Sequence, residues 1–275
     1  MSQIGKPVGV ADGSVFVAES DFSVLGIVPI QFSRYHNSRQ SPIRGFGQMW
    51  SHTFDTRVVG FGVNIYKVLN PDGTSYYYID NDGDRVYDPE VPRGERSRLR
   101  KTASNTFVRT YPDGSSEEFN ASGYLTALVN GNGNRTTITR GSNNALTRIT
   151  APDGRSINAT TDTSYRITRL TLPDGAAYLY TYLSGTGLLG SVTYPSGAIK
   201  RYEYAYIAGK GYYLSGVKDE NGNYIEKHTF DTKGRAITSS ADGTNEKLTI
   251  NYLSDIQSTV TDSFGRTTTY TLDKT

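Results

Sequence analysis

The chain contains no cysteine, and it has only one tryptophan, two methionines and three histidines. Without cysteine it can form no disulfide, no thiolate metal site and no thiol nucleophile. The formal net charge is only +2, so electrostatics gives no reason to expect binding to nucleic acid or to an anionic membrane. No apolar run reaches the roughly 18 residues that a membrane-spanning helix needs. Membrane insertion by this chain is therefore not expected.

The amino terminus, MSQIGKPVGV, also lacks a basic segment followed by an apolar one. It therefore does not resemble a secretory signal peptide. We expect a chain that is cytoplasmic before export and then secreted or displayed at the cell surface by another route. The alternating segment TTTYTLDKT runs up to Thr275 without a capping sequence. Because repeat arrays need capped ends, this predicts either a piece of a longer polypeptide or a truncated gene product. Its open strand edge would favour self-association.

What the chain does contain favours strands and turns. Among its 275 residues are 29 glycines and 21 tyrosines, and aromatic residues make up 12%. Tyrosine and threonine suit strands, and glycine and asparagine suit turns. This aromatic content also argues against disorder.

Turn glycines recur along the chain at a nearly constant spacing. The intervals between them are 21, 20, 19, 21, 21, 22, 25, 21 and 22 residues. A fixed period in this range indicates a repeat architecture. The ten glycines are Gly73, Gly94, Gly114, Gly133, Gly154, Gly175, Gly197, Gly222, Gly243 and Gly265.

A second turn lies near the middle of many repeats, and the segments between turns alternate polar and apolar residues. Examples are Leu146–Thr150 and Tyr202–Tyr206. Alternation with a period of two indicates strands, so each repeat is predicted to be one hairpin. A single hairpin is not stable alone, so we predict an all-β array of antiparallel hairpins in a curved, spiralling sheet. A propeller built from paired repeats remains an alternative.

The repeat pattern resembles the YD repeat of Rhs proteins, which are related to the C component of insecticidal Tc toxins and to the teneurins. The typical unit has Tyr-Asp, two free residues and Gly-Arg, then a short strand. Phe230–Arg235 (FDTKGR) matches it with Phe for Tyr, Phe119–Tyr124 is a looser copy, and Asp262–Arg266 matches the second turn. Other repeats lack the Tyr-Asp pair. The resemblance covers residues 69–275, at about 21 residues per unit.

The first part of the chain, residues 1–68, lacks the glycine period. Within it, Gly5–Val8, Glu19–Phe22, Arg34–Ser38 and Gly45–Trp50 resemble the segment that often precedes Rhs repeats. The resemblance implies that this segment starts or plugs a shell.

The family resemblance also implies a function. It predicts part of the wall of a β cocoon that encloses a C-terminal toxin domain and helps to deliver it, as in interbacterial competition. The implied partners are the remaining shell, the toxin domain and a secretion apparatus such as the type VI system. No cofactor and no enzymatic activity are expected, since neither a nucleophile elbow nor a phosphate loop is present. The family's self-cleaving segment with paired aspartates has no counterpart.

One acidic stretch is a candidate calcium site. Asp80, Asp82, Asp84 and Asp88 place carboxylates at alternate residues, as calcium loops do. However, Arg85 stands where such loops need glycine. The favoured interpretation is a hairpin turn between Tyr76–Ile79 and Arg85–Tyr87.

One basic run is a candidate ligand site. Arg96, Arg98 and Arg100 would share one face of a strand and could bind a sulfated glycan or a phosphate. Together with tyrosines that stack on sugars (Tyr76–Tyr78, Tyr178–Tyr182 and Tyr202–Tyr206), they support the alternative function, a cell-surface carbohydrate-binding module. The favoured interpretation is a solvated strand face and cross-strand packing of the tyrosines.

The three histidines, His36, His52 and His228, have no metal-ligand spacing with one another or with a carboxylate pair. Packing or surface roles are therefore expected for all three.

Overall fold

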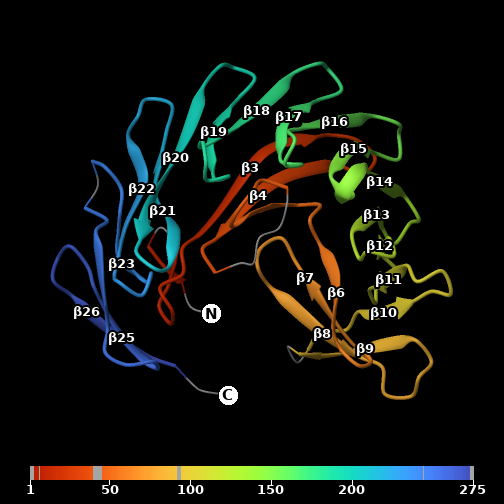
Figure 1. Cartoon of the computed structure of the whole chain (residues 1–275), viewed down its shortest axis with the longest axis horizontal. Coiled ribbons are helices and arrows are strands. Elements are labelled where there is room, and N and C mark those ends of the chain that lie inside the picture. Colours follow the sequence, from red (N-terminus) through yellow and green to blue (C-terminus); the bar gives the residue numbers. More distant parts are fainter. Residues whose placement is uncertain (1–2, 6, 40–44, 92–93, 244, 273–275) are drawn as a thin grey trace. The chain divides into compact units, whose positions relative to one another are not determined.

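The computed structural model describes residues 3–5, 7–39, 45–91, 94–243 and 245–272, and these residues form short strands joined by turns (Figure 1). The one helical element among them is a single 3-10 turn, η1 (Ser142–Asn144). Across these described ranges no helix is long and apolar enough to cross a membrane. The predicted all-β array of antiparallel hairpins is confirmed.

The chain divides into two compact units, each of which combines part of the first 70 residues with part of the hairpin series. The central unit contains residues 19–35 and 43–178. The carboxyl-terminal unit contains residues 1–18, 36–42 and 179–275.

In the central unit, each strand of the hairpin series pairs antiparallel with the next strand in the sequence. Contacts are therefore local in sequence, as in other repeat arrays. The strands are β6 (Arg57–Gly62), β7 (Ile65–Leu69), β8 (Ser75–Ile79), β9 (Val86–Val91), β10 (Arg98–Lys101), β11 (Phe107–Thr110), β12 (Ser116–Phe119), β13 (Leu125–Val129), β14 (Arg135–Arg140), β15 (Leu146–Thr150), β16 (Ser156–Thr161) and β17 (Ile167–Thr171).

The carboxyl-terminal unit continues the same plan, beginning within β18 (Ala177–Tyr182). Again each strand pairs antiparallel with its successor. The remaining strands are β19 (Leu189–Thr193), β20 (Ile199–Ile207), β21 (Gly211–Lys218), β22 (Tyr224–Phe230), β23 (Ala236–Ser240), β24 (Leu248–Tyr252), β25 (Gln257–Thr261) and β26 (Thr267–Thr271).

A shift in strand register recurs at the repeat period. In the central unit it falls between Glu118 and Phe119, then between Thr139 and Arg140, and then between Thr160 and Thr161. The carboxyl-terminal unit has the same shift after Thr181, Glu203 and Thr229. Such bulges bend a strand and increase its twist. The repeat therefore encodes one bend per hairpin as well as the turns.

The best match to the YD repeat has a clear structural cause. The Asp231 carboxylate accepts hydrogen bonds from the backbone N–H groups of Lys233 and Arg235, both at 2.9 Å, and from Arg235 Nε at 2.8 Å. Gly234, between them, has φ +77°, a conformation that favours glycine. The aspartate and arginine of the motif thus hold the turn together. Two other turns repeat this bond, Asp162 with Arg166 and Asp262 with Arg266.

The first residues of the chain supply two small sheets. β1 (Gln3–Ile4) pairs with β2 (Val8–Gly9), and β3 (Phe16–Val24), β4 (Ile30–Asn37) and β5 (Trp50–His52) form a three-stranded sheet. In the central unit their apolar side chains pack on one face of the hairpin series. The Phe22 and Tyr178 rings lie 5.0 Å apart, and the Tyr178 hydroxyl donates to the Asp21 carbonyl oxygen at 2.7 Å.

The same docking occurs in the carboxyl-terminal unit. Ser258 Oγ donates to the Val10 carbonyl oxygen at 2.8 Å, and the Ala236 N–H donates to the Gly13 carbonyl oxygen at 3.0 Å. The hairpin series already starts at Arg57, upstream of the boundary predicted between residues 68 and 69. That boundary stays a prediction.

Candidate functional site

A buried cation organises the candidate site, which lies entirely in the central unit. Arg109 on β11 has only 2% of its surface exposed. Strand pairing places it directly opposite Glu117 on β12, and its Nη1 lies 3.4 Å from Glu117 Oε2. Its Nη2 lies 3.5 Å from Glu95 Oε2, and its Nε donates to Ser97 Oγ at 2.9 Å. One guanidinium thus serves two carboxylates.

Aromatic rings enclose the same guanidinium. Its central carbon lies 4.9 Å from the ring centroids of Tyr76 and Tyr111 and 5.6 Å from that of Tyr78. The Tyr78 hydroxyl also hydrogen-bonds Ser97 Oγ at 2.6 Å. Such cation–π contacts strengthen when water is excluded, so the rings partly replace the hydration that Arg109 loses.

Burial perturbs the carboxylate of Glu117. Desolvation raises the pKa of Glu117 above its usual value, although Arg109 and a hydrogen bond from Tyr111 act in the opposite direction. The nearby Glu95 carboxylate adds to the increase. Desolvation also raises the pKa of the Tyr111 hydroxyl, which therefore stays protonated. Glu117 is thus a carboxylate whose negative charge is only partly compensated.

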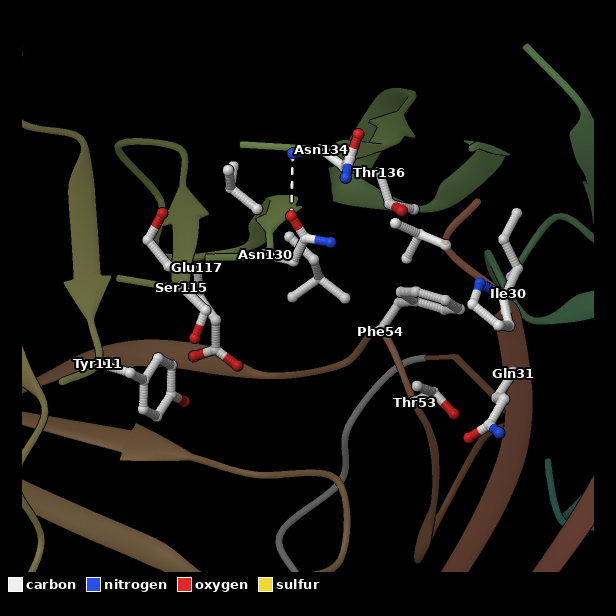
Figure 2. A pocket seen from close by; sticks show the side chains of 15 residues that line it. Ile30, Gln31, Thr53, Phe54, Tyr111, Ser115, Glu117, Asn130, Asn134 and Thr136 are labelled. Carbon is white, nitrogen blue, oxygen red and sulfur yellow. Dashed lines mark hydrogen bonds between the residues drawn. The ribbon is translucent and has the colours of Figure 1, made fainter. Parts of the chain in front are cut away.

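Beside this cluster lies a pocket with a cavity volume of about 450 Å³ (Figure 2). Tyr111 and Glu117 lie on one side of it, and Phe54 and Ile30 on the other (Figure 2). Leu128 and Val129 of β13 also line it, as do Ser115, Ser116, Asn130, Asn134 and Thr136. The pocket therefore combines an apolar wall with a carboxylate and hydroxyl groups, as ligand sites commonly do.

Hydrogen bonds within the hairpin series, and between it and the N-terminal segment, hold the pocket residues in place. Asn130 Oδ1 accepts the backbone N–H of Asn134 at 3.0 Å, a bond drawn in Figure 2. Phe54 belongs to the N-terminal segment, and its carbonyl oxygen accepts a hydrogen bond from Arg140 Nη2 at 2.5 Å. Arg140 also donates to the carbonyl oxygens of Leu125 and Asn144, at 2.7 and 3.0 Å. Arg140 thus fastens the N-terminal segment to the strands that form the pocket.

A buried histidine–carboxylate pair lies next to Phe54. His52 Nε2 and Asp55 Oδ1 are 3.1 Å apart. Burial raises the pKa of Asp55 to about 7, although Arg140 and the His52 N–H act to lower it. Burial and the charge of Arg140 hold the pKa of His52 well below its usual range. Near neutral pH the imidazole is therefore uncharged.

The predicted calcium residues separate into two groups. Carboxylate oxygens of Asp80, Asp82 and Asp84 lie within 4.8 Å of one another. Asp88 instead pairs with Arg98, with Arg98 Nε 3.0 Å from Asp88 Oδ1. The predicted hairpin is confirmed, since β8 pairs antiparallel with β9.

The Asp80 carboxylate itself forms hydrogen bonds within this turn. It accepts the backbone N–H groups of Gly83 at 2.7 Å and Arg85 at 3.1 Å. Desolvation acts to raise the pKa of Asp80, but these backbone hydrogen bonds outweigh it and hold that pKa below its usual value. Arg85, where a calcium loop needs glycine, has φ +67°. Calcium binding stays a prediction.

The predicted basic face has the expected alternation. Arg96, Arg98 and Arg100 are exposed, while Ser97 and Leu99 between them are buried. The ion pair with Asp88 partly neutralises the charge of Arg98. Ligand binding by these arginines stays a prediction.

Four of the nine tyrosines in the proposed sugar-binding ladders are buried, which agrees with cross-strand packing for these four: Tyr78, Tyr178, Tyr180 and Tyr202. Tyr76, Tyr77, Tyr182 and Tyr204 are half-buried. Tyr206 is 62% exposed, and its ring centroid lies 5.1 Å from that of Tyr212.

The three histidines are all buried, with exposed fractions of 1%, 0% and 3% for His36, His52 and His228. Of the packing or surface roles expected from the sequence, this burial supports packing for all three.

Sequence reasoning missed Arg109, Tyr111 and Glu117. One signal was present, since Phe107, Arg109 and Tyr111 alternate and so lie on one strand face. A charged residue between two aromatic residues on that face indicates a buried ion pair. Its partners, however, come from other strands and follow only from the register.

Comparison with known proteins gives one family match. The DUF6531 family model, described as a domain of unknown function, matches residues 5–86. A search of curated proteins found no match.

Several solved structures are similar at low sequence identity. The Tc holotoxin pore of Photorhabdus luminescens, with a variant TccC3, is 11% identical at a TM-score of 0.38; the alignment covers 95% of this chain and 14% of that one. The TcdB2–TccC3–Cdc42 structure is 10% identical with a TM-score of 0.39, and the alignment covers 93% of this chain and 14% of that chain. The TcdB2–TccC3 structure is 11% identical with a TM-score of 0.39, and the alignment covers 94% of this chain and 15% of that chain. This chain thus spans about a seventh of the length of the solved chains it matches.

Proposed function

We propose that this chain is a wall segment of an Rhs-type toxin shell. In this proposal the wall encloses a toxin domain encoded further along the same polypeptide and helps to deliver it. Confinement is its mechanism, and the segment itself catalyses no reaction.

The observation that carries the proposal is strand pairing limited to sequence neighbours. From β6 to β17, and again from β18 to β26, every strand pairs with its successor in the chain. Such an array grows by adding identical units, so its length can be extended to surround a cargo. The recurring bulge supplies a bend in each unit, which a closed wall needs.

A second observation concerns the first residues of the chain. In each unit they dock on the hairpin series, and in the central unit they bury aromatic side chains there, among them Trp50, Phe32 and Phe54. This agrees with a segment that starts or plugs a shell. The sequence motifs that resemble the Rhs-preceding segment lie in this region.

The proposal includes partners and location. The partners are the remaining shell and the enclosed toxin domain, with a secretion apparatus for delivery. The protein would then be made in the cytoplasm and exported without a secretory signal peptide.

The test begins with the intact mass of the native polypeptide that carries this N-terminus. We expect a mass far above that of 275 residues, and a C-terminal part that resists protease until the shell is opened by denaturant. A native product of only 275 residues, or a C-terminal part that is digested at the same rate with the shell intact, would overturn the proposal.

A further inference from the structure

The pocket beside Arg109 has a defined chemistry that the wall function leaves unused. We propose that it binds a primary ammonium group on an apolar stem, as carried by a lysine side chain of the enclosed polypeptide. The identity of the occupant as enclosed polypeptide rests on the function proposed above. The choice of a lysine side chain rests on the pocket alone.

The charge of the Arg109 cluster favours a cationic occupant. The cluster holds two carboxylates, Glu95 and Glu117, against one guanidinium, Arg109. The neighbouring Glu118 does not alter this balance, because it lies on the alternate side of β12 and pairs with Arg135, whose Nη2 is 2.8 Å from Glu118 Oε2. An added cation would bring the cluster to neutrality.

The Glu117 carboxylate is accessible from the pocket. Its side chain keeps 15% of its surface exposed, and Figure 2 shows it on the side of the pocket opposite Phe54. Its contact with Arg109, at 3.4 Å, is long for a charge-assisted hydrogen bond. A carboxylate has about four acceptor sites, so Glu117 can accept a further donor from the pocket.

The acceptors around the pocket fit the shape of an ammonium donor. The Ser115 hydroxyl already donates to Asp113 Oδ1 at 2.6 Å, so towards the pocket it is an acceptor. Ser116 also lines this part of the pocket. Acceptors on separate residues suit the three tetrahedral donors of an ammonium group better than the planar fork of a guanidinium.

The apolar wall of the pocket fits the methylene stem of a lysine side chain. Phe54, Leu128 and Val129 form an apolar part of the pocket lining, beside the polar residues Asn130, Asn134 and Thr136. Lysine buries its methylene stem along apolar surface while its ammonium group finds polar partners. A free inorganic cation or a small ammonium ion would leave this wall without a contact.

The experiment uses the whole 275-residue chain and two probes of equal stem length, Nα-acetyl-lysine methylamide and its uncharged norleucine analogue. Binding is followed by NMR titration or calorimetry. The lysine probe is expected to bind at least about tenfold more tightly than the norleucine probe, the size of one charge-assisted hydrogen bond. Equal affinity, or no binding of the lysine probe, overturns the pocket assignment.

Two variants locate the binding. Glu117→Gln should abolish the preference for lysine, and Glu118→Gln, its matched neighbour on the other side of β12, should preserve it. Asn134→Phe should block both probes by filling the pocket, whereas Asn132→Phe, an exposed position in the same turn, should not. A lysine preference that survives Glu117→Gln overturns the assignment, and Asn134→Phe tests it independently if Glu117→Gln does not fold.

A separate arm tests the occupant. In the full-length polypeptide, carbodiimide coupling should join Glu117 to a lysine beyond residue 275. Coupling only to lysines within residues 1–275 overturns the enclosed occupant even if the probes bind. Because the probes test the pocket without a shell, failure of the pocket assignment is distinguishable from failure of the wall function, which the intact mass and protease protection decide.

Discussion

Val58 and Gly123 are in direct backbone contact: the Val58 N–H donates to the Gly123 carbonyl oxygen at 2.8 Å, and a Cβ atom on Gly123 would clash with the Val58 carbonyl oxygen. Gly123 therefore has two roles. With φ +80° it forms the turn between β12 and β13, and its missing side chain lets β6 approach that turn.

The first prediction separates these two roles with a pair of alanine substitutions. Gly175 lies in the same unit, has φ +89°, and has open space where a Cβ would stand. Gly175→Ala should cost about 1 kcal/mol of unfolding free energy, the strain of a left-handed residue. Gly123→Ala adds a clash with fixed backbone and should cost roughly 3 kcal/mol or more. Urea denaturation measures both, and equal losses would show that the contact with Val58 contributes nothing.

The sequence predicts Gly123 as a turn residue but not its contact with Val58. The turn follows from local chemistry, since asparagine at Asn120 and glycine at Gly123 suffice to specify it. The contact joins residues far apart in the chain, and it depends on how the N-terminal segment docks. The same division holds for Asp231 and Arg235, whose bond is local and whose motif is visible in the sequence.

The candidate site was less predictable for the same reason. Arg109 and Glu117 face each other because β11 and β12 pair in one particular register, and a shift by one residue would place them on opposite faces. The pocket further needs Phe54, which reaches it from the N-terminal segment. Neither the pairing of Arg109 with Glu117 nor the approach of Phe54 to the pocket can be deduced from residue spacing along the sequence.

The second prediction concerns acid. The pKa of His36 is lowered from 6.5 to about 3, mainly by burial; a backbone hydrogen bond with Val15 acts to raise it, and the charge of the nearby His228 adds to the lowering. The Glu226 carboxylate lies 3.6 Å from His228 Nε2 in the same unit. Between pH 6.5 and 3 the His36 side chain binds fewer protons in the folded chain than in the unfolded chain. The contribution of His36 to stability is therefore full above about pH 6.5 and falls as the pH drops.

His36→Gln should remove the part of the acid dependence that comes from His36, because glutamine is uncharged at every pH, and leave the part that comes from the buried His52. The measurement is the urea midpoint at pH 7 and pH 5 for both proteins. The natural chain should lose more stability between these two values than the variant. If the two chains lose the same amount, His36 does not control the acid response.

The third prediction concerns Asp55, whose contribution to stability depends on pH in the opposite direction to that of His36. Burial raises the pKa of Asp55 to about 7 from 3.8, so the folded chain binds the proton more tightly than the unfolded chain. The contribution of Asp55 to stability is therefore greatest below about pH 4 and is lost as the pH rises through about 7. Asp55→Asn, which mimics the protonated acid, should remove this loss. The change in unfolding free energy from pH 6 to pH 8 should be smaller in the variant, and an unchanged difference would rule out Asp55 as its source.

The fourth prediction concerns the acidic loop of Asp80, Asp82 and Asp84. Because the Asp80 carboxylate already accepts the N–H groups of Gly83 and Arg85, its role in the turn needs no ion. Asp80→Asn should lower the Tm, and by the same amount with millimolar calcium as with a chelator. The exposed neighbour Asp82 provides the control, since Asp82→Asn should change the Tm little in either condition. A rise in the Tm of the natural chain on adding calcium, absent in both variants, would establish a calcium site in place of a simple turn.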